Sequence, residues 1–582
     1  MRRHAWFGLV LVIAGTASAQ KATVLQTLAD GSKLLERTDA AFVEGDRGLP
    51  AAGVVLRVMP DTPLQRMDGF GASMTDSSAA LLMQLAPSER EETMKLLFDP
   101  AGPLGLTLLR QPLGASDFSA HGNYSYDDLE RGGTDEKLEH FSIAQDEARI
   151  FPLLREALSL NPQLRLMVLP WSAPSWMKTS RAMNGGALED RWIGVYAHYL
   201  ARTVAAYAKD GLPVYAMALQ NEPENENETY PTQRMSPGQE IALAQQVRPL
   251  LRNAGFPTLL LGYEHNWSDT EYPRRLLATQ GLFDGISFHC YRGHEEAQRD
   301  IFAAGHPASV WFTECSGVNS GTFANDLMWQ ARHLLLGAPL NGARSVMLWN
   351  LVLRPDGGPH NGGCSDCRAL LTLHMRNGRV MWTRNVEFYL MAHAAPFVHP
   401  DAQMLPVVVS PSSSVTAAAF RNVDGTFAVL VLNEGGAGVA ADIEIDGKHL
   451  RQELPRRSLT TVGWGTPHPA VQEGTYRLRS SHGDCLEISP EPGHTLAHVA
   501  CAGAAAQLWS VSRLSRGRFE VRSVVAGDGL AVDARGEVQA IAVDGDHTSA
   551  VLLTPGNAGV CISAAAEACE AAKEWVLMPS AH

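Results

Sequence analysis

Ala218-Leu219-Gln220-Asn221-Glu222-Pro223 is a short apolar run that stops at a glutamate, and Phe312-Thr313-Glu314-Cys315 repeats this arrangement further along the chain. A carboxylate directly after a buried strand lies at the carboxyl end of that strand, where parallel α/β barrels carry their active sites. Two such carboxylates at one barrel mouth are placed for general acid and nucleophilic chemistry. The two segments therefore predict a fold and the location of a site within it.

Around these segments, short β-like runs alternate with longer helical patterns between residues 64 and 390, which is typical of βα units. Eight strands are predicted: Gln65–Gly71, Leu106–Gln111, Leu164–Leu169, Val214–Leu219, Thr258–Gly262, Gly285–His289, Ser309–Thr313 and Ser345–Leu348. Helices are predicted over Asp190–Lys209, Ser236–Asn253 and Phe323–Leu336. Eight βα units favour a (β/α)8 barrel. An open doubly wound sheet is the alternative, but no glycine-rich phosphate loop follows the first strand.

The composition limits the partners of this chain. It has 582 residues, of which 45% are hydrophobic, which is enough for a large core and more than one domain. The formal net charge is −14, which argues against nucleic acid or an anionic membrane surface as a partner. A neutral substrate fits this charge better, and the sequence leaves the oligomeric state open.

Residues 1–19 are predicted to be a secretory signal peptide. Arg2 and Arg3 precede the apolar stretch Trp6–Ile13, and Ala17-Ser18-Ala19 is a small-residue cleavage site. A membrane anchor is excluded by length, because spanning takes about 20 apolar residues. We therefore expect a secreted or periplasmic protein without stable membrane insertion.

Eight cysteines in an exported chain make disulfides plausible. Local pairs are predicted between Cys364 and Cys367, Cys485 and Cys501, and Cys561 and Cys569. Zinc at the CxxC would need a second ligand pair, and redox catalysis there would need a thioredoxin-like context. Cys290 and Cys315 flank the predicted site, and the sequence leaves their state open.

All-β segments flank the predicted barrel, and four further strands are expected at Thr416–Phe420, Phe427–Asn433, Asp442–Ile445 and Leu459–Val462. The segment Val24–Met59 is expected to add strands to the same module. The expected order is a signal peptide (1–19), N-terminal strands of a β-sandwich (20–62), a catalytic barrel (63–390), the rest of the β-sandwich (391–466) and a third β-rich domain (472–580). Pro467-His468-Pro469 is the expected linker.

Polar and aromatic residues gather at the carboxyl ends of every predicted strand except the fifth. They include Asp76, Arg110, Trp171, Trp176, Asn221, Glu222, His289, Tyr291, Glu314, Trp349 and Asn350. Taken singly, Asp76 could be a helix N-cap, His289 a core histidine and Glu314 an ion-pair partner of Arg110. Their coincidence at one end of a barrel suits a sugar, whose ring offers an apolar face and many hydroxyls.

These motifs resemble glycoside hydrolase family 30 over residues from about 60 to 465. The motifs are Asp68-Gly69-Phe70-Gly71, Leu169-Pro170-Trp171-Ser172-Ala173-Pro174, Gln220-Asn221-Glu222-Pro223, Thr313-Glu314, and Trp349-Asn350-Leu351 followed by Asp356-Gly357-Gly358-Pro359. The resemblance implies a (β/α)8 barrel fused to a β-sandwich and a retaining mechanism that needs no metal or other cofactor. It also implies roles: Glu222 as acid/base, Glu314 as nucleophile, Asp76, Trp171, Asn221 and Trp349 as sugar-binding residues, and Arg110 and Tyr291 as neighbours of the nucleophile.

We therefore expect a hydrolase of β-glucosidic bonds that works through a glycosyl-enzyme intermediate. Its substrate would be a β-linked oligosaccharide, polysaccharide or glycolipid, with glucosylceramide or β-1,6-glucan implied first. β-1,6-galactan and xylan are alternatives within the family, and a non-catalytic carbohydrate-binding protein is the alternative of another class. The polar loop Glu224–Tyr230 suits sugar hydroxyls better than lipid tails, and the cysteine-containing loop Gly362–Arg368 departs from the family pattern.

The C-terminal region resembles a ricin-type β-trefoil lectin. Cys485–Ile488, Cys501 and Gln507-Leu508-Trp509 correspond to one repeat. Gly529–Asp533 lacks the QxW mark of a second repeat, and Lys573-Glu574-Trp575 replaces that of a third. The resemblance implies sugar binding, with a purely structural trefoil as the alternative.

Overall fold

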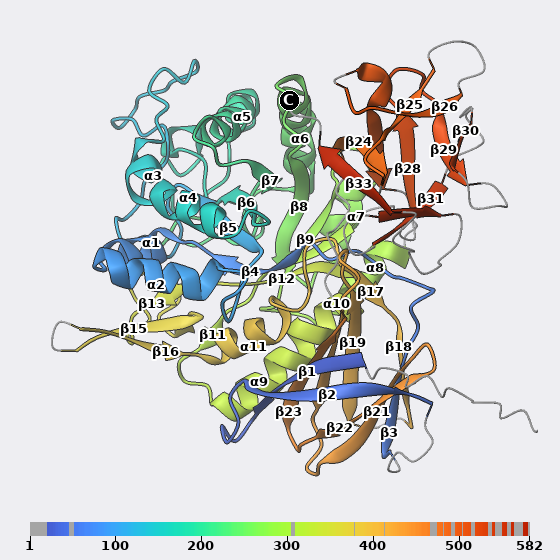
Figure 1. Cartoon of the computed structure of the whole chain (residues 1–582). Helices are drawn as coiled ribbons and strands as arrows, with labels where there is room; N and C mark the ends of the chain where they lie inside the picture. The colour runs from blue at the N-terminus through green and yellow to red at the C-terminus, as the bar shows by residue number, and fades with distance from the viewer. Residues whose placement is uncertain are drawn as a thin grey trace, which may run out of the picture. The chain divides into compact units, whose positions relative to one another are not determined.

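The computed structural model describes residues 20–45, 52–303, 309–376, 379–411 and 414–465 (Figure 1). It also describes residues 474–579 except 481, 490–494, 503, 514–517, 533–537, 542–549, 556–559 and 564–573. The predicted signal peptide, the linker Pro467-His468-Pro469 and Cys569 lie outside these ranges. The chain divides into two compact units, one of residues 1–421 and 427–464 and one of residues 422–426 and 465–582. Among the described helices, none is long and apolar enough to cross a membrane.

In the first unit, eight parallel strands close into a barrel in the order β10-β12-β4-β5-β6-β7-β8-β9. Their bounds are β4 Gly69–Ser73, β5 Leu108–Leu113, β6 Arg165–Pro170, β7 Val214–Ala218, β8 Leu259–Asn266, β9 Gly285–His289, β10 Ser309–Glu314 and β12 Ala343–Leu348. Each predicted strand overlaps one of them. The predicted (β/α)8 barrel is therefore confirmed.

β8 differs from its prediction because it continues past Gly262 to Asn266. Tyr263 and Glu264 have positive φ angles of 72° and 51°, and the register with β9 shifts between Tyr263 and His265. The strand therefore continues through a bulge, which re-aims side chains near a barrel rim. The sequence does not predict this extension, because Glu264, His265 and Asn266 are polar and lack the apolar pattern typical of a buried strand.

Helices surround the barrel (Figure 1). Their bounds are α1 Asp76–Met83, α2 Pro87–Phe98, α3 Ala144–Arg149, α4 Phe151–Leu160, α5 Ile193–Lys209, α6 Pro237–Asn253, α7 Glu271–Leu277, α8 Ala297–Ala303, α9 Phe323–Gln330, α10 Ala338–Leu340 and α11 Val386–Ala394. The helix predicted from Asp190 begins with a short 3-10 turn, and a π-helical turn at Ala331–Gly337 continues α9. α6 starts with a capping box, in which the Ser236 hydroxyl accepts a hydrogen bond from the Gln239 backbone N–H.

A buried ion cluster closes the end of the barrel opposite the glutamates. Asp68, directly before β4, is fully buried and accepts hydrogen bonds from Arg165 Nη1 at 3.1 Å and Arg344 Nη2 at 2.7 Å. Trp311 Nε1 and Tyr215 Oη donate to the same carboxylate at 2.6 and 2.8 Å. Because four donors from four segments share one carboxylate, Asp68 holds the amino ends of the strands together.

A ten-stranded β layer stands beside the barrel in the order β17-β19-β20-β23-β1-β2-β22-β21-β3-β18. Its bounds are β1 Gln20–Leu28, β2 Glu36–Glu44, β3 Val54–Val58, β17 Gln403–Leu405, β18 Val407–Ser410, β19 Val415–Arg421, β20 Phe427–Asn433, β21 Val439–Ile445, β22 Lys448–Leu454 and β23 Ser458–Trp464. Val24 of β1 pairs with Val462 of β23. The N-terminal strands therefore join the same module, as predicted.

Five further strands form two small sheets outside the barrel. They are β11 Gly317–Val318, β13 Val352–Leu353, β14 Cys367–Arg368, β15 Leu371–Arg376 and β16 Arg379–Arg384. β11 pairs with β14, which ties the loop after β10 to the loop after β12.

The described residues of the second unit form ten strands and one short 3-10 turn, Ala505–Gln507. Its strands are β24 Gly474–Ser480, β25 Cys485–Ile488, β26 Leu496–Val499, β27 Trp509–Arg513, β28 Arg518–Ser523, β29 Gly529–Val532, β30 Val538–Ile541, β31 Ala550–Pro555, β32 Val560–Ser563 and β33 Glu574–Pro579. The predicted disulfide between Cys485 and Cys501 is present. Trp509 is fully buried and donates its indole N–H to the Leu486 carbonyl at 3.0 Å. The QxW tryptophan is therefore part of the core of this unit.

Candidate active site

Glu222 and Glu314 meet at the carboxyl ends of the barrel strands. Glu314 is the last residue of β10, and Glu222 lies shortly after the end of β7, with a positive φ of 47°. A carboxylate oxygen of Glu222 lies within 4.8 Å of a carboxylate oxygen of Glu314. Carboxyl groups about 5 to 5.5 Å apart are typical of retaining glycosidases, whereas inverting enzymes leave room for a water between them.

Arg110 of β5 organises this end of the barrel, and its side chain is fully buried. Its Nη1 donates to Glu314 Oε2 at 2.6 Å, and its Nη2 donates to Asn221 Oδ1 at 2.7 Å. Nε and Nη2 also donate to Glu264 Oε1 at 3.1 and 2.9 Å. The rigid guanidinium fork therefore sets the positions of side chains from β7, β8 and β10 relative to one another.

Tyr291 completes the surroundings of Glu314. Its hydroxyl donates to Glu314 Oε1 at 2.7 Å, while Arg110 donates to the other oxygen. Both carboxylate oxygens of Glu314 are therefore held by strong donors, which fixes the orientation that a nucleophile needs.

His289, considered above as a core histidine, is instead part of the site. Its Nδ1 lies 3.1 Å from Glu222 Oε1 and its Nε2 lies 3.4 Å from Glu264 Oε1. Burial lowers the pKa of His289, but the charge of Glu314 and the hydrogen bonds to Glu222 and Glu264 raise it above its usual value. Burial raises the pKa of Glu222, and the hydrogen bond and charge of His289 outweigh that effect and lower it. Both shifts favour the proton on His289 over Glu222.

Trp171 and Trp349 form an aromatic wall. Their rings stack with centroids 5.1 Å apart and an interplanar angle of 22°. The Arg110 guanidinium carbon lies 4.9 Å from the Trp171 ring centroid and 5.3 Å from that of Trp349. Such a wall offers an apolar surface to one face of a sugar ring.

Two functional candidates were missed by sequence reasoning. Glu264 lies on β8, the fifth barrel strand, whose predicted end carries no gathered polar residues. The β8 bulge turns its carboxylate toward Arg110. Asp117, in the loop after β5, lines the cavity, and its Oδ1 has no hydrogen-bond partner among the described residues. Burial raises the pKa of Asp117 well above its usual value, and the charges of Glu314 and Glu222 raise it further. The signal for Glu264 was the polar run directly after Gly262.

Asp76 is placed differently from the other predicted residues. It is the first residue of α1, and its carboxylate lies 2.9 Å from His121 Nδ1. The N-cap of this helix is Thr75, whose hydroxyl accepts from the Ser78 backbone N–H. Among the described residues that line the cavity, Asp76 is absent.

The cavity over the glutamates has a volume of about 740 Å³. It is lined by Asp117, Trp171, Asn221, Glu222, Glu224, Asn225, Glu226, Tyr230, His265, Asn266, Ser268, Tyr291, Arg292, Glu314, Trp349, Cys364 and Cys367. At its rim, the predicted disulfide between Cys364 and Cys367 is present, and the Thr229 hydroxyl donates to the Gly362 carbonyl at 2.9 Å. A polar, partly open cavity of this kind fits a hydrophilic chain.

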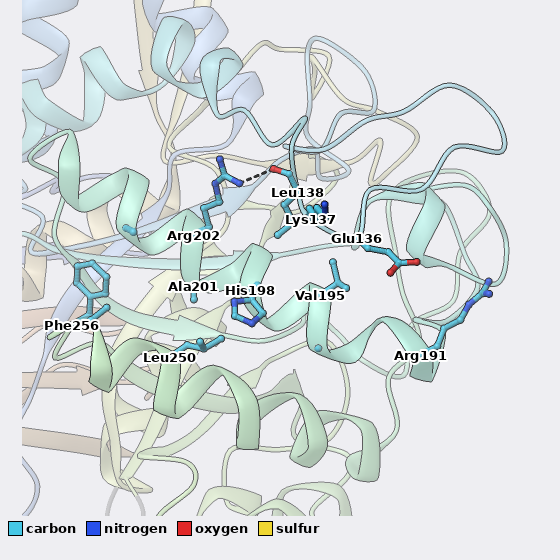
Figure 2. Close-up of a pocket in the computed structure, with 13 residues that line it drawn as sticks. Glu136, Lys137, Leu138, Arg191, Val195, His198, Ala201, Arg202, Leu250 and Phe256 are labelled. Carbon is cyan, nitrogen blue, oxygen red and sulfur yellow. Dashed lines mark hydrogen bonds between the residues drawn. The ribbon is translucent and has the colours of Figure 1, made fainter.

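The described residues also form a second groove and two groups of side chains that could hold a metal ion. A groove of about 670 Å³ runs along α5 and α6, where Arg202 donates to the Leu138 carbonyl at 2.7 Å, and none of the predicted site residues lines it (Figure 2). Two groups of described side chains have spacing that could hold a metal ion. One is Asp127 with Asp135 and His140, and the other is Glu222 with His289 and Glu314.

The chain matches the glycosyl hydrolase family 30 TIM-barrel domain over residues 67–261 and the family 30 beta sandwich domain over residues 401–462. It is 30% identical over 429 residues to endo-1,6-beta-D-glucanase neg1 of Aspergillus fumigatus, covering 69% of this chain and 85% of that protein. It is 25% identical to the lysosomal acid glucosylceramidase of Mus musculus, covering 71% and 84%. The solved structure of the endo-beta1,6-glucanase BT3312 aligns with a TM-score of 0.70 and 26% identity, covering 77% of this chain and all of that one. Fold, site and sequence agree: the chain belongs to glycoside hydrolase family 30.

Proposed function

We propose that this chain is an endo-acting β-1,6-glucanase that retains configuration, with Glu314 as nucleophile and Glu222 as acid/base. The observation that carries the mechanism is the close approach of the two carboxylates, within 4.8 Å, at one barrel mouth. The linkage is supported by the relatives, because three with 29 to 30% identity are endo-1,6-beta-D-glucanases. β-glucosidic hydrolysis is the activity that these findings have in common.

In the first step, Glu222 donates a proton to the glycosidic oxygen while Glu314 attacks the anomeric carbon. The bond to the leaving group breaks, and a glycosyl ester of Glu314 forms. We expect the proton to reach Glu222 from His289 Nδ1, 3.1 Å from Glu222 Oε1, because the pKa shifts of the pair favour the proton on the imidazole. The hydrogen bonds from Arg110 and Tyr291 weaken as Glu314 loses its negative charge in forming the ester.

In the second step, Glu222 removes a proton from water, and the water oxygen attacks the anomeric carbon on the face that the leaving group vacated. The ester bond to Glu314 breaks, and the carboxylate regains its hydrogen bonds from Arg110 and Tyr291. Two displacements restore the original anomeric configuration. Asn221, held by Arg110, is placed to bond the sugar 2-hydroxyl, a contact that strengthens in the transition state.

The rim favours a glucan chain over a glycolipid. Beyond Glu222, the cavity is lined by Glu224, Asn225, Glu226, Tyr230, His265, Asn266 and Arg292. These side chains offer hydrogen bonds to the hydroxyls of a leaving-group sugar but no continuous apolar surface for acyl chains. Trp171 and Trp349 would bind the apolar face of the sugar whose bond is broken, and Asp117 would bind its hydroxyls.

We also propose the remaining organisation of the chain. Residues 1–19 would be a cleaved signal peptide for export, residues 63–390 the catalytic domain, residues 20–62 with 391–466 its β-sandwich, and residues 472–580 a carbohydrate-binding β-trefoil. The disulfides support export, because such bonds persist in oxidising compartments. The buried Trp509 and the Cys485–Cys501 disulfide support the trefoil.

The test is to incubate the purified chain with β-1,6-glucan, glucosylceramide, β-1,6-galactan and glucuronoxylan and to identify the released sugars over time. We expect a ladder of β-1,6-linked oligosaccharides from the glucan early in the reaction. Release of glucose alone would contradict endo action. Faster turnover of any of the other three substrates would overturn the proposed specificity while leaving the hydrolase assignment intact.

A further inference from the structure

A disulfide joins the carboxyl ends of β9 and β10. Glu314, the proposed nucleophile, is the last residue of β10, and Tyr291, which donates a hydrogen bond to it, follows the end of β9. Cys290 directly follows β9 and Cys315 directly follows β10, and their Cα atoms are 5.4 Å apart. One cysteine of the bond therefore directly follows Glu314 in the sequence, and the other stands between His289 and Tyr291. The mechanism derived above does not use it.

The pairing of β9 with β10 becomes irregular at this point. Phe312 pairs with Phe288, but the register shifts before Glu314 pairs with His289. A bulge leaves the ladder locally disrupted. Past it, one backbone hydrogen bond joins the two segments, from the Cys290 N–H to the Glu314 carbonyl at 3.3 Å. The disulfide is therefore the strong connection beyond the bulge.

The two ends of the disulfide differ in how firmly packing holds them. Cys315 is 2% exposed, and its carbonyl accepts a hydrogen bond from the Trp349 N–H at 2.8 Å, which anchors it to the barrel interior. Cys290 is half-buried, and Tyr291 is 43% exposed although its hydroxyl reaches Glu314. The disulfide thus ties a segment at the open mouth to a fixed point in the core.

We propose that the Cys290–Cys315 disulfide is a positioning element that keeps the Tyr291 hydroxyl on Glu314, so that full hydrolytic activity requires this bond. Cys290 and Cys315 act through Tyr291 and do not touch substrate. When the bond is open, the exposed Tyr291 segment moves away from the carboxylate for part of the time. Glu314 then keeps the Arg110 hydrogen bond and the more distant His289 contact at 3.9 Å, but it loses the hydrogen bond from Tyr291 and with it the orientation needed for attack.

The expected effect is on kcat rather than on KM. A misplacement of about 1 Å near a reacting group costs on the order of 10²-fold in rate. The rate is an average over the placed and displaced positions of Tyr291, and displacement for half to nine-tenths of the time lowers it about 2-fold to 10-fold. We therefore expect kcat to fall about 2-fold to 10-fold, with KM changed less than about 3-fold. The bond persists in oxidising compartments, so the protein would reach full activity only after export.

The first test opens the disulfide without changing any residue. Dithiothreitol reduces the folded protein by giving two electrons and two protons to the disulfide, which yields two thiols and the cyclic oxidised reagent. We expect kcat on an aryl β-glucoside to fall and to return on reoxidation, while circular dichroism stays unchanged. The Cys290→Ser/Cys315→Ser variant should already be slow and insensitive to dithiothreitol, whereas Cys485→Ser/Cys501→Ser should respond like wild type.

The second test separates positioning from a general loss of structure. Tyr291→Phe removes the hydroxyl that donates to Glu314, so its effect and that of Cys290→Ser/Cys315→Ser should not add in a double-mutant cycle. Additive losses, or full kcat in protein whose Cys290 and Cys315 are shown by mass spectrometry to be thiols, would overturn the inference. The inference rests on the proposed role of Glu314. If Glu314→Gln stays active, that role fails; if Glu314→Gln is inactive and reduction has no effect, only the disulfide proposal fails.

Discussion

Arg110 and Glu314 form an ion pair of 2.6 Å between β5 and β10, in which the arginine side chain is fully buried and the glutamate side chain 7% exposed. Glu264 contacts the same guanidinium at 2.9 Å. One cation therefore pairs with two carboxylates that water barely reaches. Because opposite charges attract more strongly where solvent is excluded, this arrangement holds the carboxylate of the proposed nucleophile in a fixed position.

Glu314→Gln removes the attacking carboxylate but keeps the shape of the side chain. We expect hydrolysis of an aryl β-glucoside to fall by about 10⁴-fold or more, because the amide cannot form the glycosyl ester. Steady-state kinetics measures the loss, and a thermal melt within a few degrees of wild type shows that the fold persists. Turnover near the wild-type rate would remove Glu314 from the nucleophile role.

Glu222→Ala removes the proton donor and the base. On a substrate with a good leaving group, the first step needs little acid help, so added azide should attack the intermediate and restore turnover with formation of a β-glycosyl azide. Glu228→Ala, on the same loop but exposed and outside the cavity lining, is the matched control and should not respond to azide. Absence of rescue in Glu222→Ala would point to another acid.

Arg110→Met leaves Glu314 and Glu264 without their shared cation. Breaking a buried ion pair on one side typically costs about 3 to 5 kcal/mol, so the free energy of unfolding in urea should fall by about that amount. Activity should also fall, because Asn221 and Glu314 lose the donor that orients them. Arg110→Lys keeps the charge without the fork and should recover stability more than activity. Equal recovery of both would contradict a role for the fork geometry.

The pH dependence should follow the proton shared by His289 and Glu222. The pKa of His289 is raised to about 9, so the pair keeps its proton at neutral pH and loses it as pH rises through that value. We expect kcat/KM to fall on that alkaline side. In His289→Asn, only Glu222 can hold the proton, so the alkaline limb should move to lower pH. An unchanged limb would exclude His289 from the proton path.

The raised pKa of His289 also predicts how the stability of the protein depends on pH. A histidine whose folded-state pKa is raised contributes stability that is complete below its unfolded pKa of about 6.5 and is lost as pH rises through the folded value, about 9. Urea unfolding between pH 6 and 9.5 should show this decline in wild type and a smaller one in His289→Asn. A parallel decline in both proteins would assign it to other groups.

Asp117 and Asp76 can be compared directly as sugar-binding residues. Asp117 lines the cavity, and among the described residues its Oδ1 has no hydrogen-bond partner, whereas the Asp76 carboxylate contacts His121. We expect Asp117→Ala to raise KM by at least about 10-fold, because a lost hydrogen bond to substrate costs about 1.5 kcal/mol or more. Asp76→Ala should change KM little and lower the melting temperature instead. The reverse pattern would support the sugar-binding role that the sequence motif implies for Asp76.

The sequence by itself determined the barrel and the two glutamates. Short apolar runs that end in polar residues are a local pattern, and the carboxyl ends of parallel strands share one rim by topology alone, so Glu222 and Glu314 could be placed together without coordinates. The tertiary structure decided what surrounds them. Glu264 enters the site through a bulge with positive φ, and Asp117 rather than Asp76 faces the cavity. Strand β9 meets β10 closely enough for Cys290 to bond Cys315. These features depend on distances between segments remote in the chain, and the protonation of His289 depends on charges brought near it only when the barrel closes.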